Sequence, residues 1–288
     1  MLMQFLASGF MLGSVYGLVA LGFAAIYKAT RVFNFAQGML MATGAYLAVT
    51  GSVVLGLPLV GTIAFVVVAA GTLGVVIQWL LIRPLAGRPL LAMVMITIAL
   101  SIILRALIVI IFGGGAQTLR LGLPEGSFVL GSVRISAIHA TAAGVSWLCM
   151  ALFMVFFRFS KAGLLMRATA DSHEAAVLSG VNVNRINATA WALGTILAAI
   201  GGVFLGQLQV ASVELENIGL LALPAVVIGG LQSIPGAIIG GLLVGLIEQL
   251  SSGYISPKAR DIFVYVPLLI ILLVRPWGLF GERELGRV

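Results

Sequence analysis

Charged residues are scarce in this chain: 9% of its 288 residues are Asp, Glu, Lys or Arg, whereas 61% are apolar. Because soluble domains carry about a quarter charged residues, this scarcity excludes an ordinary soluble fold. Cys149 is the only cysteine, so a disulfide within the chain is excluded. The two histidines, His139 and His173, are too few and too far apart for a metal site, and no nucleophile–base spacing is present. The sequence therefore predicts no enzyme, no metal and no other cofactor.

Apolar runs of bilayer length take the place of the missing charges, and the mean hydropathy is +1.19. A helix needs about 20 apolar residues to cross the hydrocarbon, and five runs are this long: Phe5–Tyr27, Leu59–Ile82, Leu90–Phe112, Ala137–Phe157 and Ala188–Val210. Others are shorter or broken by Gly, Pro or polar residues: Phe35–Leu55, Ile218–Leu231, Ala237–Ser251 and Ile262–Val274. We predict an all-α, polytopic membrane protein that forms a single domain over residues 1–288, with eight or nine crossings.

The basic residues predict the orientation. With nine crossings, the N-terminus lies outside and the C-terminus lies in the cytoplasm. The inner loops then hold eleven Lys and Arg residues and the outer loops four, which is a strong positive-inside bias. The net charge of +7 therefore has a topological meaning, and we expect no nucleic acid partner.

The longest polar passage is the predicted cytoplasmic loop, residues 158–186. Asp171 is expected to cap a short helix, with Glu174 reaching back to the cap N–H as in a capping box. Gly180 is a natural stop for a helix from Ser172 to Ser179. Its small apolar surface consists of Ala175, Ala176, Val177 and Leu178. Because so short a helix is unstable alone, packing against a partner must hold it.

Glu174-Ala175-Ala176, followed after three residues by Gly180, resembles the EAA loop of ABC importer permeases. In that family a short coupling helix in this loop sits in a groove of the ATPase subunit. The usual downstream Ile-x-Leu-Pro is absent, and the stretch from Ala190 to Leu193 stands in its place. This departure disfavours the amino-acid and maltose type of permease.

Three further passages resemble the branched-chain amino acid (LIV-type) permeases. Residues 32–38 and 44–46 are similar to that family's Asn-Phe-Ala-x-Gly…Gly-Ala-Tyr stretch. Residues 229–241 are similar to its Gly-Gly…Ile-Pro-Gly…Gly-Gly segment, and residues 275–281 match its closing signature. The motifs follow the family's order nearly end to end, and the shorter of its two permease types fits best.

This resemblance implies a permease subunit of an ATP-driven importer for branched-chain or similar small amino acids, in the bacterial inner membrane. The implied partners are a second homologous permease chain, ABC ATPase subunits, an extracytoplasmic substrate-binding protein and the lipid bilayer. The chain holds no Gly-x-x-x-x-Gly-Lys-[Ser/Thr] segment to cradle a phosphate. If transport is ATP-driven, the ATPase must therefore be another polypeptide.

Two breaks in apolar segments, at residues 34–44 and 224–241, are candidates for the translocation path. Interrupted segments point to a path at the membrane midplane, because unwound backbone is tolerated only beside protein or water. The candidate residues in them are Asn34, Gln37, Gly229 and Gly230. The glycines fit close helix packing as well, above all in the pairs Gly13-x-x-x-Gly17, Gly202-x-x-x-Gly206 and Gly241-x-x-x-Gly245.

Two charges, Arg105 and Glu248, fall well inside predicted spans. Because a charge at this depth costs roughly 2.5–3.5 kcal/mol, each must face protein or water. They fit either an ion pair with each other or a direct role in the path. Glu214 and Glu216 are predicted on the outer face, where they fit either plain solvation or contact with a docking partner.

Other functions fit parts of the same sequence. Permeases for urea, short amides or another small solute share the architecture, so the residues leave the substrate open. An ion-coupled carrier that works alone needs ionisable groups along its path, and Arg105 and Glu248 are the two that qualify.

Overall fold

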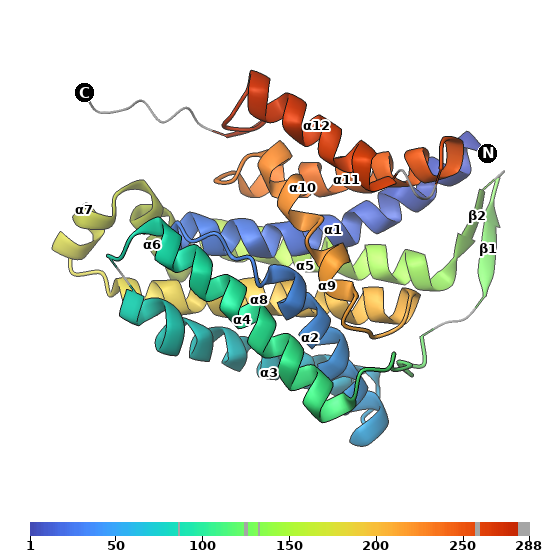
Figure 1. The fold of residues 1–288 in the computed structure, drawn as a ribbon, viewed down its shortest axis with the longest axis horizontal. Coiled ribbons are helices and arrows are strands. Elements are labelled where there is room, and N and C mark those ends of the chain that lie inside the picture. The colour runs from blue at the N-terminus through green and yellow to red at the C-terminus, as the bar shows by residue number, and fades with distance from the viewer. Residues whose placement is uncertain (86, 124–125, 132, 257–259, 282–288) are drawn as a thin grey trace.

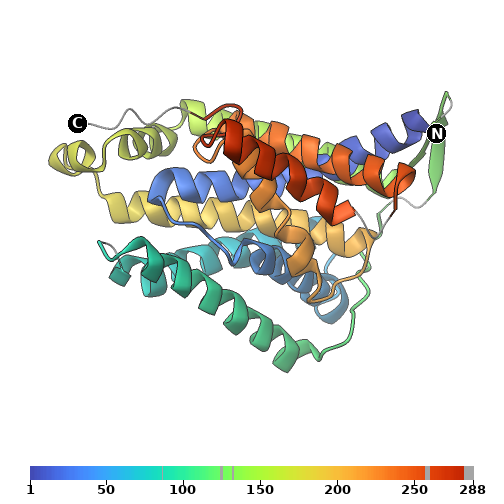
Figure 2. The ribbon, with the colours of Figure 1, turned by 45° about the horizontal axis from the view of Figure 1, so that its top comes forward.

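The computed structural model describes residues 1–85, 87–123, 126–131, 133–256 and 260–281. This part of the chain is a bundle of helices (Figures 1 and 2). Six helical segments are long and apolar enough to cross a membrane: α1 (Leu2–Thr30), Leu59–Leu85, α4 (Leu90–Phe112), α5 (Ala137–Phe159), α8 (Val183–Leu208) and α11 (Ile234–Tyr254). The prediction of a polytopic helical membrane protein is confirmed at this level.

Each broken or shorter apolar passage is also helical. Residues 35–55 form α2 (Gln37–Val49) and the π-helical turn η1 (Thr50–Val54). Residues 215–229 form two short helices, α9 (Leu215–Gly219) and α10 (Ala222–Gly229), and α12 (Arg260–Val274) is the final helix. The 59–85 span consists of α3 (Leu59–Ile77), η2 (Gln78–Ile82) and η3 (Arg83–Leu85).

The local sequence explains where several of these helices begin and end. Pro58 and Pro89 stand directly before α3 and α4, where proline's missing N–H costs no hydrogen bond. Ser233 caps α11, because its hydroxyl accepts the Gly236 N–H at 3.1 Å. The apolar run that begins at Ala188 lies within α8, which begins earlier, at Val183, because the Asn182 side chain accepts the Arg185 N–H at 3.2 Å.

The centre of the bundle is α1, which packs most extensively on α11 and α8. Its seam with α11 is made by glycines. A Cβ on Gly241 would collide with Gly17, and a Cβ on Gly245 would collide with Gly13. Two of the predicted glycine pairs therefore pack on each other, and the backbones approach as small residues allow.

A second seam joins α8 to α2 and α3. A Cβ on Gly202 would collide with Met41 of α2, and one on Gly44 would collide with Ala199 of α8. About two turns before Ala199 on the same face of α8, a Cβ on Gly74 of α3 would lie 2.8 Å from the Ala192 Cα. The third predicted glycine pair thus also serves close packing.

The two ends of the bundle differ. At one end, α6 (Lys161–Asp171) and α7 (His173–Leu178) project beyond the long helices (Figures 1 and 2). At the other end, the start of α1 lies beside an antiparallel hairpin of β1 (Ser127–Leu130) and β2 (Val133–Ser136). Gln4 holds this hairpin through two hydrogen bonds to the Arg134 backbone, of 2.7 and 2.9 Å. The all-α prediction is therefore wrong for this short segment.

Candidate functional site

The helix predicted in the polar loop is present as α7, and its C-terminal end is as predicted. Gly180 has φ +79°, the left-handed conformation in which glycine is strongly preferred. The Val181 N–H donates to the Ala176 carbonyl, and the Gly180 N–H donates to the Val177 carbonyl, each at 3.0 Å. This is the hydrogen-bond pattern of a Schellman motif, so Gly180 ends the helix.

The predicted N-terminal cap is wrong by one residue. Asp171 is the last residue of α6, and Ser172 separates the two helices in an extended conformation. The Ser172 hydroxyl accepts the Ala175 N–H at 3.2 Å and caps α7. Glu174 is then the second helical residue, so it is too early for a capping box, although its charge still suits the positive end of the helix.

The surface of α7 is mostly exposed. Leu178 is 89% exposed and Val177 is 52% exposed, while Ala176 is buried against the chain. Glu174 and Ala175 are exposed as well. An almost fully exposed leucine at the tip of a six-residue helix provides an apolar contact that the chain itself does not cover.

The sequence prediction missed α6, which fastens α7 to the bundle. The Ser160 hydroxyl caps it by accepting the Gly163 N–H at 2.9 Å, and a serine directly before residues 161–171 was the available signal. Arg167 donates to the carbonyls of Phe157 and, at 3.3 Å, Arg158. Arg31, at the end of α1, donates to the Ala170 carbonyl at 3.3 Å. A displacement of α6 would therefore reach α5 and α1 directly.

A cavity of about 540 Å³ lies beneath α6. Its walls carry three cations and one carboxylate, together with the loop that starts α11. Lys28 of α1 contacts this loop: its ammonium donates a hydrogen bond to the Gln232 carbonyl at 3.1 Å. The charged side chains in the wall are Lys28, Arg158, Arg167 and Asp171.

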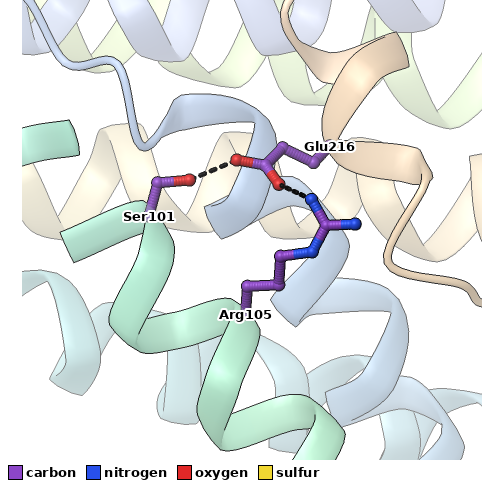
Figure 3. A network of polar contacts seen from close by, with 3 residues as sticks. All are labelled: Ser101, Arg105 and Glu216. Carbon is purple, nitrogen blue, oxygen red and sulfur yellow. Dashed lines mark hydrogen bonds and ion pairs between the residues drawn. The ribbon is translucent and has the colours of Figure 1, made fainter. Parts of the chain in front are cut away.

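A second polar cluster lies about halfway along α4, where Glu216 of α9 meets Ser101 and Arg105 of α4 (Figure 3). The Ser101 hydroxyl donates to Glu216 Oε1, and Arg105 Nη1 lies 3.3 Å from Glu216 Oε2. Ser101 is the twelfth of the 23 residues of α4, so the carboxylate lies near the midpoint of this span. The Glu216 side chain is 15% exposed and that of Arg105 is 49% exposed.

This cluster corrects two predictions. Glu216 was expected on the outer face, but the turn before α9 carries it inward to α4. Of the two alternatives for Arg105 and Glu248, the ion pair with each other is wrong: Arg105 pairs with Glu216, and Glu248 is buried on α11 at 3% exposure. The charge of Arg105 also acts on Glu214. The pKa of that carboxyl is lowered by hydrogen bonds from a backbone N–H and the Ser212 hydroxyl, and further by Arg105.

Asn34 and Gln37 lie at the bend between α1 and α2, buried and bonded to each other. The Asn34 amide donates to Gln37 Oε1 at 2.9 Å, and its own oxygen accepts the Ala36 N–H at 3.1 Å. The Gln37 amide donates to the Val19 carbonyl at 3.2 Å. The bond from Ala36 satisfies a backbone N–H of the bend, and the bond to Val19 ties Gln37 to the middle of α1. A role for either residue in the path stays a prediction.

Gly229 and Gly230 end α10, away from the polar cluster. A Cβ on Gly229 would collide with Gly236, and Gly230 has φ +109°. The closing motif packs here, since the Leu279 and Phe280 N–H groups donate to the Ile228 and Gly229 carbonyls at 2.9 and 3.0 Å. Close packing accounts for both glycines, and a role for either in the path stays a prediction. The predicted second break also begins earlier than expected, between α9 and α10, and Pro224 lies within α10.

The first break and this earlier break meet in the structure. A Cβ on Gly38, in the first turn of α2, would collide with the Glu216 carbonyl, and one on Gly219 would collide with Gly38. The two interrupted segments therefore cross at the level of the polar cluster. In the described part of the chain, no group of three or more His, Cys, Asp or Glu side chains has the arrangement of a metal site.

Interrupted helices that cross each other point to a transport path, and comparison with known proteins gives the family. The family model described as "branched-chain amino acid transport system / permease component" matches residues 5–272. The chain belongs to this permease family. The resemblance seen in the sequence motifs is thereby confirmed, and the chain is a membrane protein of the inner (cell) membrane.

Three curated relatives illustrate the range of this permease family. The chain is 32% identical to the high-affinity branched-chain amino acid permease LivH of Escherichia coli, over 99% of this chain and 97% of LivH. It is also 32% identical to BraD of Pseudomonas aeruginosa, over 99% and 98% of the two chains. A probable permease of Methanocaldococcus jannaschii is 28% identical, over 92% and 88%.

Among solved structures, the permease fold is similar to PsaBC from Streptococcus pneumoniae, determined in complex with a Fab. The TM-score is 0.50 with 15% sequence identity, and the match covers 95% of this chain and 92% of the PsaBC chain. At this identity the likeness concerns the fold alone.

Proposed function

We propose that this chain is the membrane-spanning permease subunit of an ATP-driven importer for branched-chain amino acids, and that it works by alternating access. A second homologous permease, two ATPase subunits and an extracytoplasmic substrate-binding protein would complete the transporter. Membership of the permease family and the named substrates of its relatives support the substrate class.

The proposed topology has nine crossings, with the N-terminus outside and the α6–α7 end in the cytoplasm. The crossings would be α1, α2 with η1, α3 with η2, α4, α5, α8, α9 with α10, α11 and α12. Lys28, Arg83, Arg158 and Arg185 stand at helix ends that face α6 and α7, as the positive-inside rule requires of a cytoplasmic face. Arg134, on β2, stands at the opposite end.

The observation that carries the mechanism is the exposed tip of α7. This helix ends in an apolar residue, Leu178, that the chain leaves in water, and it is joined through α6 to α5 and α1. In the proposed cycle, ATP binding moves the ATPase surface that holds α7. The motion passes through Arg167 and Arg31 to the spans and opens the other face of the path.

Uptake of radiolabelled leucine by the complete transporter in proteoliposomes tests this mechanism. Glu174→Lys reverses an exposed charge beside the tip, and Gly180→Pro forces φ from +79° to about −65° and removes the N–H that closes α7. We expect both variants to insert into the membrane and to lose uptake. Normal uptake by both would overturn the mechanism.

A matched control separates this effect from general backbone damage. Gly122 has φ +60°, and nothing lies within 4 Å of a Cβ built on it. It precedes the hairpin at the other end of the bundle, so Gly122→Pro imposes a similar strain away from α7. We expect this variant to keep its uptake, and an equal loss would trace the defect to folding.

A further inference from the structure

The position of Arg105 shows that its side of α4 faces neither lipid nor a sealed core. The residue lies one turn from the midpoint of α4, and its side chain is 49% exposed. A guanidinium at this depth avoids hydrocarbon and faces protein or water. The exposed side of Arg105 therefore borders the translocation path or the second permease.

The ion pair also has unused binding capacity. A guanidinium carries five N–H donors and a carboxylate has about four lone-pair sites. Arg105 uses Nη1 for Glu216, and among the described residues no hydrogen bond engages its Nη2 or Nε. Glu216 accepts one bond from Ser101 and one from Arg105. Each partner therefore retains room for a group of opposite charge.

The surface around the pair is apolar. At 100° per residue, Ile98, Ile102 and Val109 lie within about 60° of Arg105 around α4. Their exposed fractions are 37%, 65% and 40%. Along this edge of α4, an opposite-charge pair thus interrupts a stripe of branched aliphatic side chains.

We propose that Ser101, Arg105 and Glu216 form a binding site for the zwitterionic head group of an amino acid that passes through the permease. We call these three residues the head-group site. This inference rests on the proposed function and adds a location and a chemistry to it. Arg105 binds the α-carboxylate through its free N–H groups, and Glu216 binds the α-ammonium.

The aliphatic stripe then contacts the substrate side chain, so the head-group site and the stripe together match an amino acid with an apolar side chain. In the absence of substrate, Arg105 and Glu216 neutralise each other. When the substrate binds, its carboxylate replaces Glu216 as the partner of Arg105, and its ammonium replaces Arg105 as the partner of Glu216. No charge is then left unpaired at the middle of the membrane. Ser101 is a positioning residue, because its hydroxyl holds Glu216 towards Arg105.

The test compares Arg105→Gln and Glu216→Gln in the complete transporter, reconstituted with its ATPase and leucine-loaded binding protein. Two quantities are measured: the stimulation of ATP hydrolysis by the loaded binding protein, and the leucine delivered per ATP hydrolysed. We expect stimulation within about twofold of wild type and about tenfold less leucine per ATP, the loss expected when a charge-assisted hydrogen bond is removed. Arg120→Gln, an exposed arginine outside the three-residue cluster, is the control and should change neither quantity.

The outcomes separate the head-group site from a purely structural ion pair. Unchanged leucine per ATP in both variants would overturn the head-group site. If the single variants fail to assemble, the exchanged pair Arg105→Glu with Glu216→Arg decides. A structural pair would recover both quantities, whereas a head-group site would recover assembly and ATP hydrolysis but not leucine per ATP. A wild-type transporter without leucine uptake would instead refute the proposed function.

Discussion

The proposed docking of α7 predicts a measurable affinity contribution from Leu178. In the isolated chain, 89% of this side chain is exposed, so nearly all of its burial energy is still available to a partner. Burying a leucine side chain is worth about 1.5–3 kcal/mol, and alanine retains a smaller part of that. Leu178→Ala should therefore weaken ATPase binding by about 1–2 kcal/mol, or roughly 5- to 30-fold in Kd.

The assay is equilibrium binding of the purified ATPase subunits to the detergent-solubilised permease, with thermal unfolding measured on the same samples. Because Leu178 contributes almost no burial within the chain, the unfolding temperature of Leu178→Ala should equal that of wild type. Leu273→Ala is the matched control, since Leu273 is 85% exposed but belongs to α12 and not to the α6–α7 segment.

Two results would refute this reasoning. Unchanged ATPase affinity in Leu178→Ala would show that the tip of α7 is not a docking contact. An equal loss in Leu273→Ala would show that any exposed leucine on this chain affects the measurement, and the effect would then carry no information about α7.

Two further predictions concern the bundle and its path-facing edge. Gly241→Leu should destabilise the permease by more than about 1–3 kcal/mol, because the new side chain would collide with the α1 backbone at Gly17. Gly144→Leu is the control, since nothing lies within 4 Å of a Cβ at Gly144, and it should leave the thermal unfolding temperature unchanged. In a Cys149→Ser background, Ile102→Cys should react with a charged, membrane-impermeant thiol reagent. Ile103→Cys, at similar depth but about 160° from Arg105 around α4, should not react. Equal labelling of the two variants would contradict a water-filled path beside Arg105.

Much of the fold was predictable because the relevant signals are local. The length of an apolar run and the residues at its ends determine a membrane helix, and the predicted limits of α4 agree with the structure. The glycine stop of α7 was equally visible, since left-handed backbone strongly favours glycine. The cap was placed one residue too early because Asp171 and Ser172 are both good caps, and only the end of α6 distinguishes them.

The candidate site was less predictable than the helices. The sequence indicates that Arg105 must face protein or water at membrane depth, but the one carboxylate it places at the same depth is Glu248, and it places Glu216 on the outer face. The turn before α9 decides that Glu216, and not Glu248, pairs with Arg105. The position of this turn depends on the close packing of Gly219 against Gly38.

The sequence by itself determined that this chain is a helical membrane permease, because hydrophobic length and short motifs are properties of single segments. The tertiary structure decided which polar groups meet. Arg105 and Glu216 are 111 residues apart in the chain, and their contact depends on which faces of α2, α4 and α9 pack together. No local pattern encodes that choice, because it is the sum of many backbone contacts between helices.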